Sequence, residues 1–261
     1  MSQGAEASVS CPDPLQGGWR EYGHRVGLWR MARALAEYPV AVTAPVEPGL
    51  LDQNPEVAAL VRERGWEVIG HGPSMIPPGG ADDGSQERAF LERSAAIVRR
   101  HTGQVLAGML DVGAAHGPRL MDRMAQAGLR YLAGPPCDDV PVPMRTAHGL
   151  LWSMPFPQEI SDAARFAGSC DVDLLVQAAC DQFDRLWHEA DEEGEGLVFC
   201  WPLHAPLIGQ PHAVGALRRV LDHVCSHGEL WHAQARDIVD VARRCHEGQP
   251  AFEAWLREVP A

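Results

Sequence analysis

Short apolar runs alternate with helical patterns from residue 19 onward, and this alternation is what most constrains the fold. Strands separated by helices of about 10–15 residues are typical of βα units around a largely parallel sheet. We predict strands in seven stretches, namely PVAVTA, WEVIGH, VLAGML, LRYLA, LLWSM, LVFCW and ELWHA. The pattern therefore predicts a single α/β, barrel-like domain over residues 19–261, with no linker that would divide it.

The predicted helices have recognisable start and stop residues. Apolar residues at helical spacing predict the first helix over residues 24–37. Asn54 before Pro55, and Ser85 before an amphipathic stretch, are suitable N-cap residues for the next two helices. Further helices are expected over residues 117–127, 173–191, 212–226 and 234–245, and the acidic run 189–195 is typical of a solvated helix end.

The beginning of the chain is unusual because its first predicted element is a helix. Residues 1–18 are polar and rich in Gly and Pro, so we expect them to form a flexible arm. They contain no apolar run that could supply a strand ahead of the helix. One strand of a closed barrel is therefore expected to be missing, and an open sheet edge invites pairing with another chain.

Most of the predicted strands end at an acid or a histidine. The residues in question are Glu47, His71, Asp111, Glu159 with Asp162, and His204. In α/β barrels the loops at the carboxyl ends of the strands converge on one mouth, where the chemistry takes place. These positions therefore predict an acid-rich, histidine-containing pocket. Each side chain also has a structural alternative, since acids after strands often cap the next helix and a histidine can anchor a loop.

The composition excludes several classes of function. A formal net charge of −13 argues against a nucleic-acid or anionic-membrane partner, since both need basic surface. All 22 basic residues are Arg, which excludes a Schiff-base lysine. The seven Cys are scattered without a CxxC pair, as expected of free thiols in a reducing cytoplasm. The first residues lack the pattern of a signal peptide, and no stretch is long and apolar enough to span a membrane.

Other motifs give little support for other chemistry. His223 and His227 stand four residues apart on a predicted helix, which is the spacing of a helical zinc pair. No third ligand converges with them in the sequence, and a histidine just before Gly228 also suits a helix C-terminus. The chain has no GxSxG, P-loop or dinucleotide-binding fingerprint, so nothing supports a serine hydrolase, an NTPase or a redox enzyme.

Two ten-residue segments resemble a known family. Residues 21–30 read EYGHRVGLWR, and residues 203–212 read LHAPLIGQPH. They resemble the EYGxRxGxWR and LHxxLIGQPxR segments of the polysaccharide deacetylase (NodB-like) superfamily, in the branch that holds metal-independent allantoinases. Residues 54–57, 71–72 and 155–162 follow the order of the same family. The resemblance covers residues 19–245 and implies a distorted (β/α)7 barrel that lacks its usual first strand.

The departures from the family concern its metal site. The first-strand pair of Asp residues has no counterpart, and the family's two histidines four residues apart are here His71 and Met75. One imidazole and one thioether cannot build a catalytic zinc site that needs three ligands. The family's arginine is also absent from residues 110–116. The resemblance therefore carries over His71, Glu159, Asp162 and His204 as pocket residues, and we expect neither a metal nor a cofactor.

Three functions remain open. The favoured hypothesis is a metal-independent acid/base enzyme in natural-product biosynthesis, in which a substrate amine displaces a neighbouring sulfate to close an aziridine ring. The chain is similar to the deacetylase-like component of two-protein systems in azinomycin-type pathways, so a small partner protein would complete the barrel. The alternatives are a metal-independent C–N hydrolase of allantoinase or deacetylase type, and a non-catalytic, degenerate barrel subunit. The expected catalytic residues are Glu47, Asp111, His204 and His71, and the expected substrate-binding residues are Glu159, Asp162, Arg25 and His116.

Overall fold

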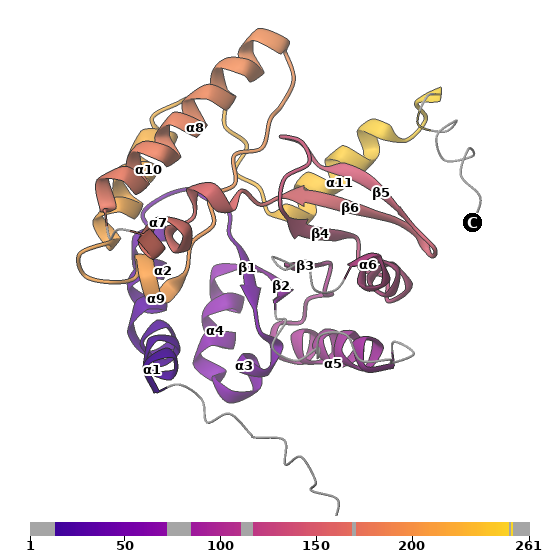
Figure 1. The fold of residues 1–261 in the computed structure, drawn as a ribbon, viewed down its shortest axis with the longest axis horizontal. Coiled ribbons are helices and arrows are strands. Elements are labelled where there is room, and N and C mark those ends of the chain that lie inside the picture. Colours follow the sequence, from indigo (N-terminus) through magenta and orange to yellow (C-terminus); the bar gives the residue numbers. More distant parts are fainter. Residues whose placement is uncertain (1–13, 72–84, 111–116, 169–170, 251, 253–261) are drawn as a thin grey trace, which may run out of the picture.

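A six-stranded sheet with helices around it forms the centre of the protein (Figure 1). The structure is a computed structural model, and it describes residues 14–71, 85–110, 117–168, 171–250 and 252. The strands are β1 (Thr43–Val46), β2 (Glu67–His71), β3 (Gly108–Leu110), β4 (Tyr131–Gly134), β5 (Val142–Thr146) and β6 (Gly149–Pro155). Their order in the sheet is β1-β2-β3-β4-β6-β5, with every pair parallel except the hairpin β5–β6.

The sheet does not close on itself in the described part of the chain, and β1 and β5 are its edges. This confirms the expected α/β fold with an incomplete parallel barrel. Strand β5 was not predicted, because its sequence VPMRT interrupts the apolar pattern with a proline. Pro143 can be accommodated there because β5 pairs with β6 only. On an edge strand, some backbone N–H groups face away from the sheet and have no strand partner to bond to, so a proline can replace one of them.

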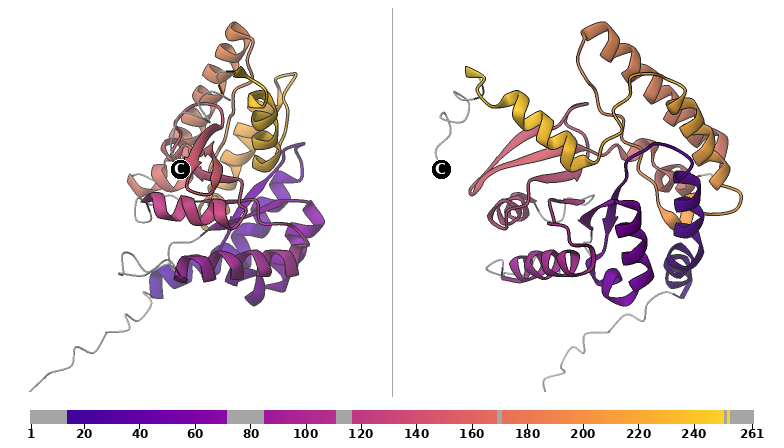
Figure 2. Two further views of the ribbon diagram at one scale, coloured as in Figure 1. Left: turned by 90° about the vertical axis from the view of Figure 1, so that its right-hand side faces the viewer. Right: turned by 180° about the vertical axis from the view of Figure 1, so that it is seen from behind.

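The helices cover the sheet and also form a separate pair. They are α1 (Pro14–Tyr22), α2 (Leu28–Leu35), α3 (Pro48–Gln53), α4 (Pro55–Arg64), α5 (Ser85–Thr102), α6 (Gly117–Gln126), α7 (Asp162–Gly168), α8 (Val172–Glu193), α9 (Ala205–Ile208), α10 (Val214–Cys225) and α11 (Ala235–His246). Helices α8 and α10 lie side by side and stand away from the sheet (Figures 1 and 2). No helix in the described ranges combines the length and apolar character needed to cross a bilayer.

The first predicted helix is divided into pieces. Helix α1 begins at Pro14, inside the segment 1–18 that we expected to be a flexible arm, and residues 1–13 lie outside the described ranges. A π-helical turn, η1 (Gly23–Gly27), then separates α1 from α2. The spacing of apolar residues does not predict such a turn, because a π-helical turn adds one residue without ending the helix.

Two of the seven predicted strands are wrong. LVFCW and ELWHA fall in the irregular residues 195–204 and 228–234. Their apolar side chains, Phe199, Trp201, Leu203 and Leu230, pack instead against the core between α8 and α10. An apolar run shows that side chains are buried, but it cannot show whether a sheet or a helix pair buries them.

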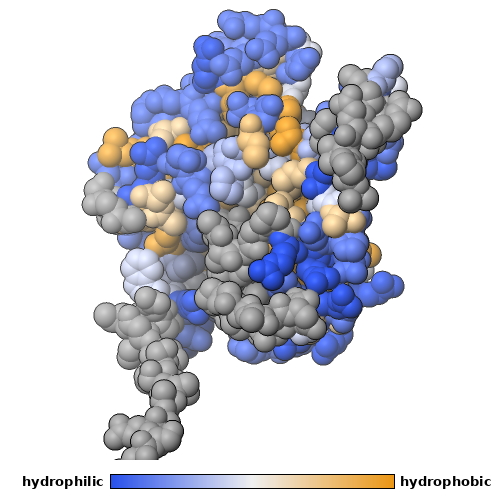
Figure 3. Space-filling view, turned by 45° about the vertical axis from the view of Figure 1, so that its right-hand side comes forward, coloured by the Kyte–Doolittle hydropathy of each residue, from blue (hydrophilic) through white to orange (hydrophobic). Residues whose placement is uncertain are grey.

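The acidic run at the end of α8 is solvated, as predicted. Residues 191–196 are exposed, and Gly194 ends the helix in the left-handed conformation. The upper tip of the molecule, where α8 ends, is correspondingly hydrophilic, whereas apolar side chains lie below it (Figure 3).

A buried carboxylate fastens the amino ends of the strands. Glu67, at the start of β2, is 1% exposed, and its oxygens accept hydrogen bonds from Thr43 Oγ1 (3.0 Å), Tyr131 OH (2.8 Å) and the backbone N–H of Arg236 (3.1 Å). Burial raises the pKa of Glu67, and burial together with the Glu67 charge raises the pKa of Tyr131. Since Arg236 lies in the first turn of α11, Glu67 ties that helix to three strands.

The Glu67 network gives a prediction about stability. Glu67→Ala should lower the free energy of unfolding by about 3 kcal/mol, because it leaves several buried donors without an acceptor. Glu67→Gln should cost less, since the amide keeps one acceptor oxygen and carries no charge to desolvate. Urea unfolding measures both, with Glu63→Ala on exposed α4 surface as the control. Equal midpoints for Glu67→Ala and Glu63→Ala would show that the network does not stabilise the fold.

Candidate active site

The clearest candidate site is a pair formed by Asp162 and His204. His204 Nδ1 lies 2.7 Å from Asp162 Oδ1, and Asp162 Oδ2 accepts the backbone N–H of His204 (2.9 Å) and of Ile208 (3.2 Å). The Asp162 side chain is fully buried, whereas 46% of the His204 side chain is exposed. The buried carboxylate therefore holds the Nδ1 side of the imidazole ring, while the opposite edge of the ring can reach solvent or substrate.

Asp162 is free to bond to His204 because its neighbour Ser161 caps helix α7. Asp162 is the first residue of α7, where an acid commonly caps the helix. Here Ser161 takes that role, since its Oγ accepts the N–H of Ala164 (3.1 Å). Asp162 is thereby left to turn toward α9, whose N-cap position is His204. Trp201 Nε1 donates to the carbonyl of Ile160 (3.1 Å) and holds the two segments together.

The hydrogen bonds define which nitrogen of His204 carries the proton. An ionised carboxylate has only acceptor oxygens, so Nδ1 must donate to Asp162. In the neutral ring Nε2 then has a free lone pair, which can take a proton from water or from a substrate. The same carboxylate stabilises the imidazolium once the proton has moved. This arrangement suits a general base that later returns its proton as an acid.

The two motif segments pack backbone against backbone at Gly27 and Gly209. A Cβ at Gly27 would overlap the carbonyl of Ala205, and a Cβ at Gly209 would overlap both Ala205 and the backbone of Gly27. Arg30 NH1 donates to Tyr22 OH (2.8 Å) and to the carbonyl of Gly209. The turn η1 is therefore a close-fitting backbone support for α9, and through α9 for His204.

This contact predicts the effect of adding a methyl group. Gly209→Ala should lower the free energy of unfolding by about 2 kcal/mol, because backbone atoms must move apart to admit the Cβ. Gly215→Ala on α10 is the matched control, since nothing lies within 4 Å of its Cβ position and Ala favours the helix. Thermal unfolding compares the two. A Gly209→Ala protein as stable as Gly215→Ala would contradict the packing role.

The charge of Glu47 acts on a histidine that the sequence did not single out. Glu47 occupies the N-cap position of α3 but makes no side-chain capping bond, which disfavours the capping alternative. His24, in η1, is half-buried, and this burial lowers its pKa, while the charges of Glu21 and Glu47 partly offset the burial. The only signal of His24 was its place inside the family-like segment 21–30.

The charge interaction between Glu47 and His24 can be tested by titration. Glu47→Gln removes a negative charge that favours the imidazolium form, so the pKa of His24 should fall further below 6.5. NMR titration of the ring proton measures the shift, and Glu63→Gln should leave the pKa unchanged. An unchanged or higher value in Glu47→Gln would show that the two groups do not interact.

The remaining predicted residues fall into three groups. His71 ends β2, and the register that pairs Val46 with Gly70 brings Glu47 beside it at the same level of the sheet. Glu159 in the turn η2 (Gln158–Ile160) and Arg25 in η1 are exposed, so neither shares the buried position of Asp162. Asp111 and His116 lie outside the described residues, as does Met75.

The candidate residues in the described part of the chain do not fit the metal set that the superfamily resemblance implies. Among the described residues one group of three potential ligands occurs, and it lies between α8 and α10 rather than at His71. The His204–Asp162 pair supplies a single imidazole to the mouth, and Asp162 already accepts three hydrogen bonds. We therefore derive no catalytic step through a metal at these positions.

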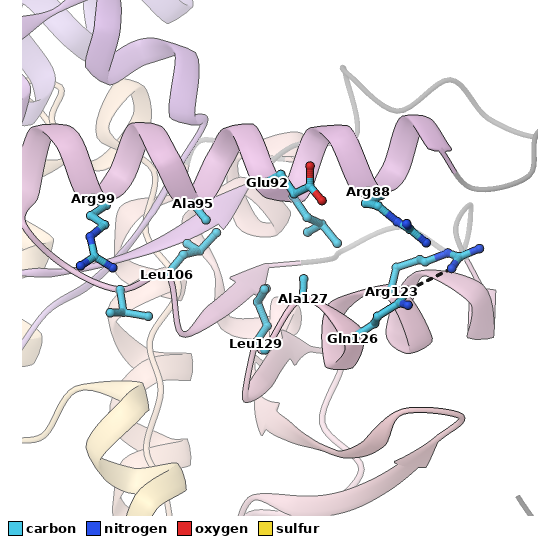
Figure 4. A pocket seen from close by; sticks show the side chains of 12 residues that line it. Arg88, Glu92, Ala95, Arg99, Leu106, Arg123, Gln126, Ala127 and Leu129 are labelled. Carbon is cyan, nitrogen blue, oxygen red and sulfur yellow. Dashed lines mark hydrogen bonds between the residues drawn. The ribbon is translucent and has the colours of Figure 1, made fainter.

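A surface groove lies elsewhere, between α5 and α6 (Figure 4). It has a volume of about 510 Å³ and combines the apolar side chains of Leu106 and Leu129 with Arg88, Arg99 and Glu92. It lies mainly against two outer helices that are far from α9, which is beside α1 and α2 (Figure 1). The groove is therefore separate from the Asp162–His204 pair.

The chain is similar to several known proteins, although no family model matches it. A Schizosaccharomyces pombe protein, provisionally named as a polysaccharide deacetylase, is 25% identical over 237 residues, which are 84% of this chain and 73% of the relative. A structure from Pseudomonas aeruginosa PAO1, also provisionally named as a polysaccharide deacetylase, has a TM-score of 0.80 at 27% identity and covers 91% of this chain and 79% of that one.

An allantoinase structure is nearly as similar. The Puue allantoinase has a TM-score of 0.78 at 26% identity, and the match covers 91% of this chain and 78% of the allantoinase. In sequence and in fold, the chain is thus similar to proteins named as polysaccharide deacetylases and to an allantoinase.

Proposed function

We propose that this protein hydrolyses a C–N bond, in an amide or a ureide, and that His204 transfers the proton. The observation that carries this proposal is the buried carboxylate of Asp162, which holds Nδ1 of a half-exposed imidazole at 2.7 Å. The likenesses to an allantoinase and to proteins named as deacetylases support it, since those names denote action on allantoin and on acetylated polysaccharide. The substrate class is therefore a small nitrogenous compound or an N-acyl sugar.

His204 and Asp162 can account for every proton transfer in the proposed reaction, with water as the other reactant. Nε2 of His204 takes a proton from water while the water oxygen bonds to the carbonyl carbon. The resulting imidazolium is held by the Asp162 carboxylate, which stays ionised throughout. His204 then gives the proton to the nitrogen as the C–N bond breaks, so the amine leaves and the acid product remains. Neither residue is changed after one cycle.

The neighbouring polar groups would orient the substrate. By strand register Glu47 follows β1 at the level of His71, and its charge acts on His24. These groups can accept or donate hydrogen bonds to ureide N–H and C=O groups. We also propose Asp111 as a further acid of the site. Substrate binding is assigned to Arg25, Glu159 and His116. Orientation by several such groups is worth a large part of a hydrolytic barrier.

Aziridine closure is the second candidate, and one observation favours it. The sheet is open at β1 and β5, so a partner chain could add the strand that a closed barrel would have. In that case Nε2 of His204 takes a proton from a substrate amine, the amine nitrogen bonds to the adjacent carbon, and the C–O bond to sulfate breaks. Hydrolysis is the better supported of the two, because the named relatives are of hydrolytic type.

The test compares variants of the pair on a panel of substrates. The panel contains allantoin, an N-acetyl amino sugar, an acetylated oligosaccharide and a vicinal amino sulfate. His204→Ala should lower kcat/KM on a C–N substrate by about 10²- to 10⁴-fold. Asp162→Asn should lower kcat with little change in KM and should shift the pH profile, since it alters the tautomer rather than substrate binding. His148→Ala, in an exposed turn, is the control.

Three results would decide against the proposal. Turnover that survives in His204→Ala would remove that residue from the mechanism. Release of sulfate without hydrolysis of any C–N substrate would establish ring closure instead. A folded protein that turns over none of the panel, alone or with the product of a neighbouring gene, would favour the non-catalytic barrel subunit.

A further inference from the structure

The two histidines four residues apart on the predicted helix acquire a third neighbour in the structure. His223 lies near the end of α10, and His227 follows two residues after the helix. Asp184, on the adjacent helix α8, has its Oδ1 2.6 Å from His223 Nε2. One ligand atom from each of the three residues lies within 4.8 Å of the other two. The sequence could not show this group, because Asp184 and His223 are 39 residues apart.

We propose that Asp184, His223 and His227 form a binding site for a borderline divalent cation, with Zn²⁺ as the best match. Two imidazole nitrogens and one carboxylate oxygen are the ligands that zinc accepts, whereas Mg²⁺ and Ca²⁺ prefer oxygen alone. Three protein ligands leave the fourth tetrahedral position to water. This site is independent of the proposed hydrolase activity and uses none of its residues.

The distances fit such an ion after small side-chain movements. Zinc lies about 2.0–2.2 Å from each ligand in tetrahedral geometry, which puts the ligand atoms roughly 3.3–3.5 Å apart. His223 Nε2 and Asp184 Oδ1 would separate by less than about 1 Å from their present 2.6 Å, and the ion would replace the proton between them. All three side chains are half-buried, so the ion can enter from solvent.

One ring nitrogen of His227 is held by a hydrogen bond, which leaves the other nitrogen for a metal ion. Its Nδ1 lies 3.0 Å from the backbone carbonyl of His223 and must donate there, so Nε2 has its lone pair available. Phe183 packs edge-on against both imidazoles, with ring centroids 4.9 Å from His227 and 5.9 Å from His223. Trp187 packs against His227 at 5.4 Å. These contacts leave the imidazoles few other orientations.

The consequence would be a metal clamp between α8 and α10. Each of these helices contacts the other more than it contacts any other element, and both stand away from the sheet (Figures 1 and 2). A ligand that binds only the folded state stabilises it by mass action. The Asp184–His223 ion pair alone would give no such dependence on metal concentration.

The test measures metal binding to the full chain rather than activity. Protein freed of metal with a chelator should bind one Zn²⁺ per chain in a calorimetric titration, with its unfolding midpoint raised by about 5 °C or more at 100 times Kd. Co²⁺ in place of Zn²⁺ should give a tetrahedral spectrum without thiolate charge-transfer bands, which separates this site from binding by cysteines.

Variants then assign the site. His227→Gln, His223→Gln and Asp184→Asn should each weaken binding by more than about 100-fold, since even the outer partners of metal ligands are worth about 10- to 100-fold. His188→Ala, an exposed histidine on α8, should bind as the wild type does. Because the readout is the shift caused by metal, a variant of lower basal stability is still informative. Absence of stoichiometric binding, or tight binding that persists in the His223→Gln/His227→Gln double variant, would overturn the proposal.

Discussion

The hydrogen bonds of Asp162 are the constraint on which the candidate site depends. Moving a carboxylate into a protein interior costs about several kcal/mol unless donors replace its water. Asp162 has three such donors, all supplied by the short segment from His204 to Ile208. If α9 moved away, the buried charge would lose all of them at once. The segment that carries the imidazole is therefore held in place by the same acid that orients the ring.

Close backbone packing supports that arrangement from the other side. Gly27 and Gly209 allow η1 and α9 to approach backbone against backbone, and Arg30 bonds to the carbonyl of Gly209. Both glycines lie in the two family-like segments, 21–30 and 203–212. The residues that carry the resemblance are thus largely structural, and they act on chemistry through the position of His204.

The two buried carboxylates of the described chain have different roles, and their partners show why. Glu67 is bonded to two hydroxyl groups and one backbone N–H, and none of these can react with a ligand from solvent. It fastens α11 to the amino ends of the strands. Asp162, beyond the carboxyl end of β6, is bonded to an imidazole of which nearly half is exposed. Burial alone therefore does not distinguish a catalytic carboxylate from a structural one. The difference is that the hydrogen-bond partner of Asp162 is exposed to solvent.

The sequence by itself determined the α/β class, the order of most helices and the presence of acids and histidines after the strands. These features are local, since periodicity and capping residues act within a few positions along the chain. Only the tertiary structure decided that Asp162 turns inward while Glu159 faces solvent, and that the charge of Glu47 acts on His24. It also decided that LVFCW and ELWHA pack on a helix pair and that Asp184 meets His223. Each of these contacts joins segments that are distant in the sequence. The pattern of apolar and polar residues in one segment does not specify which distant segment packs against it.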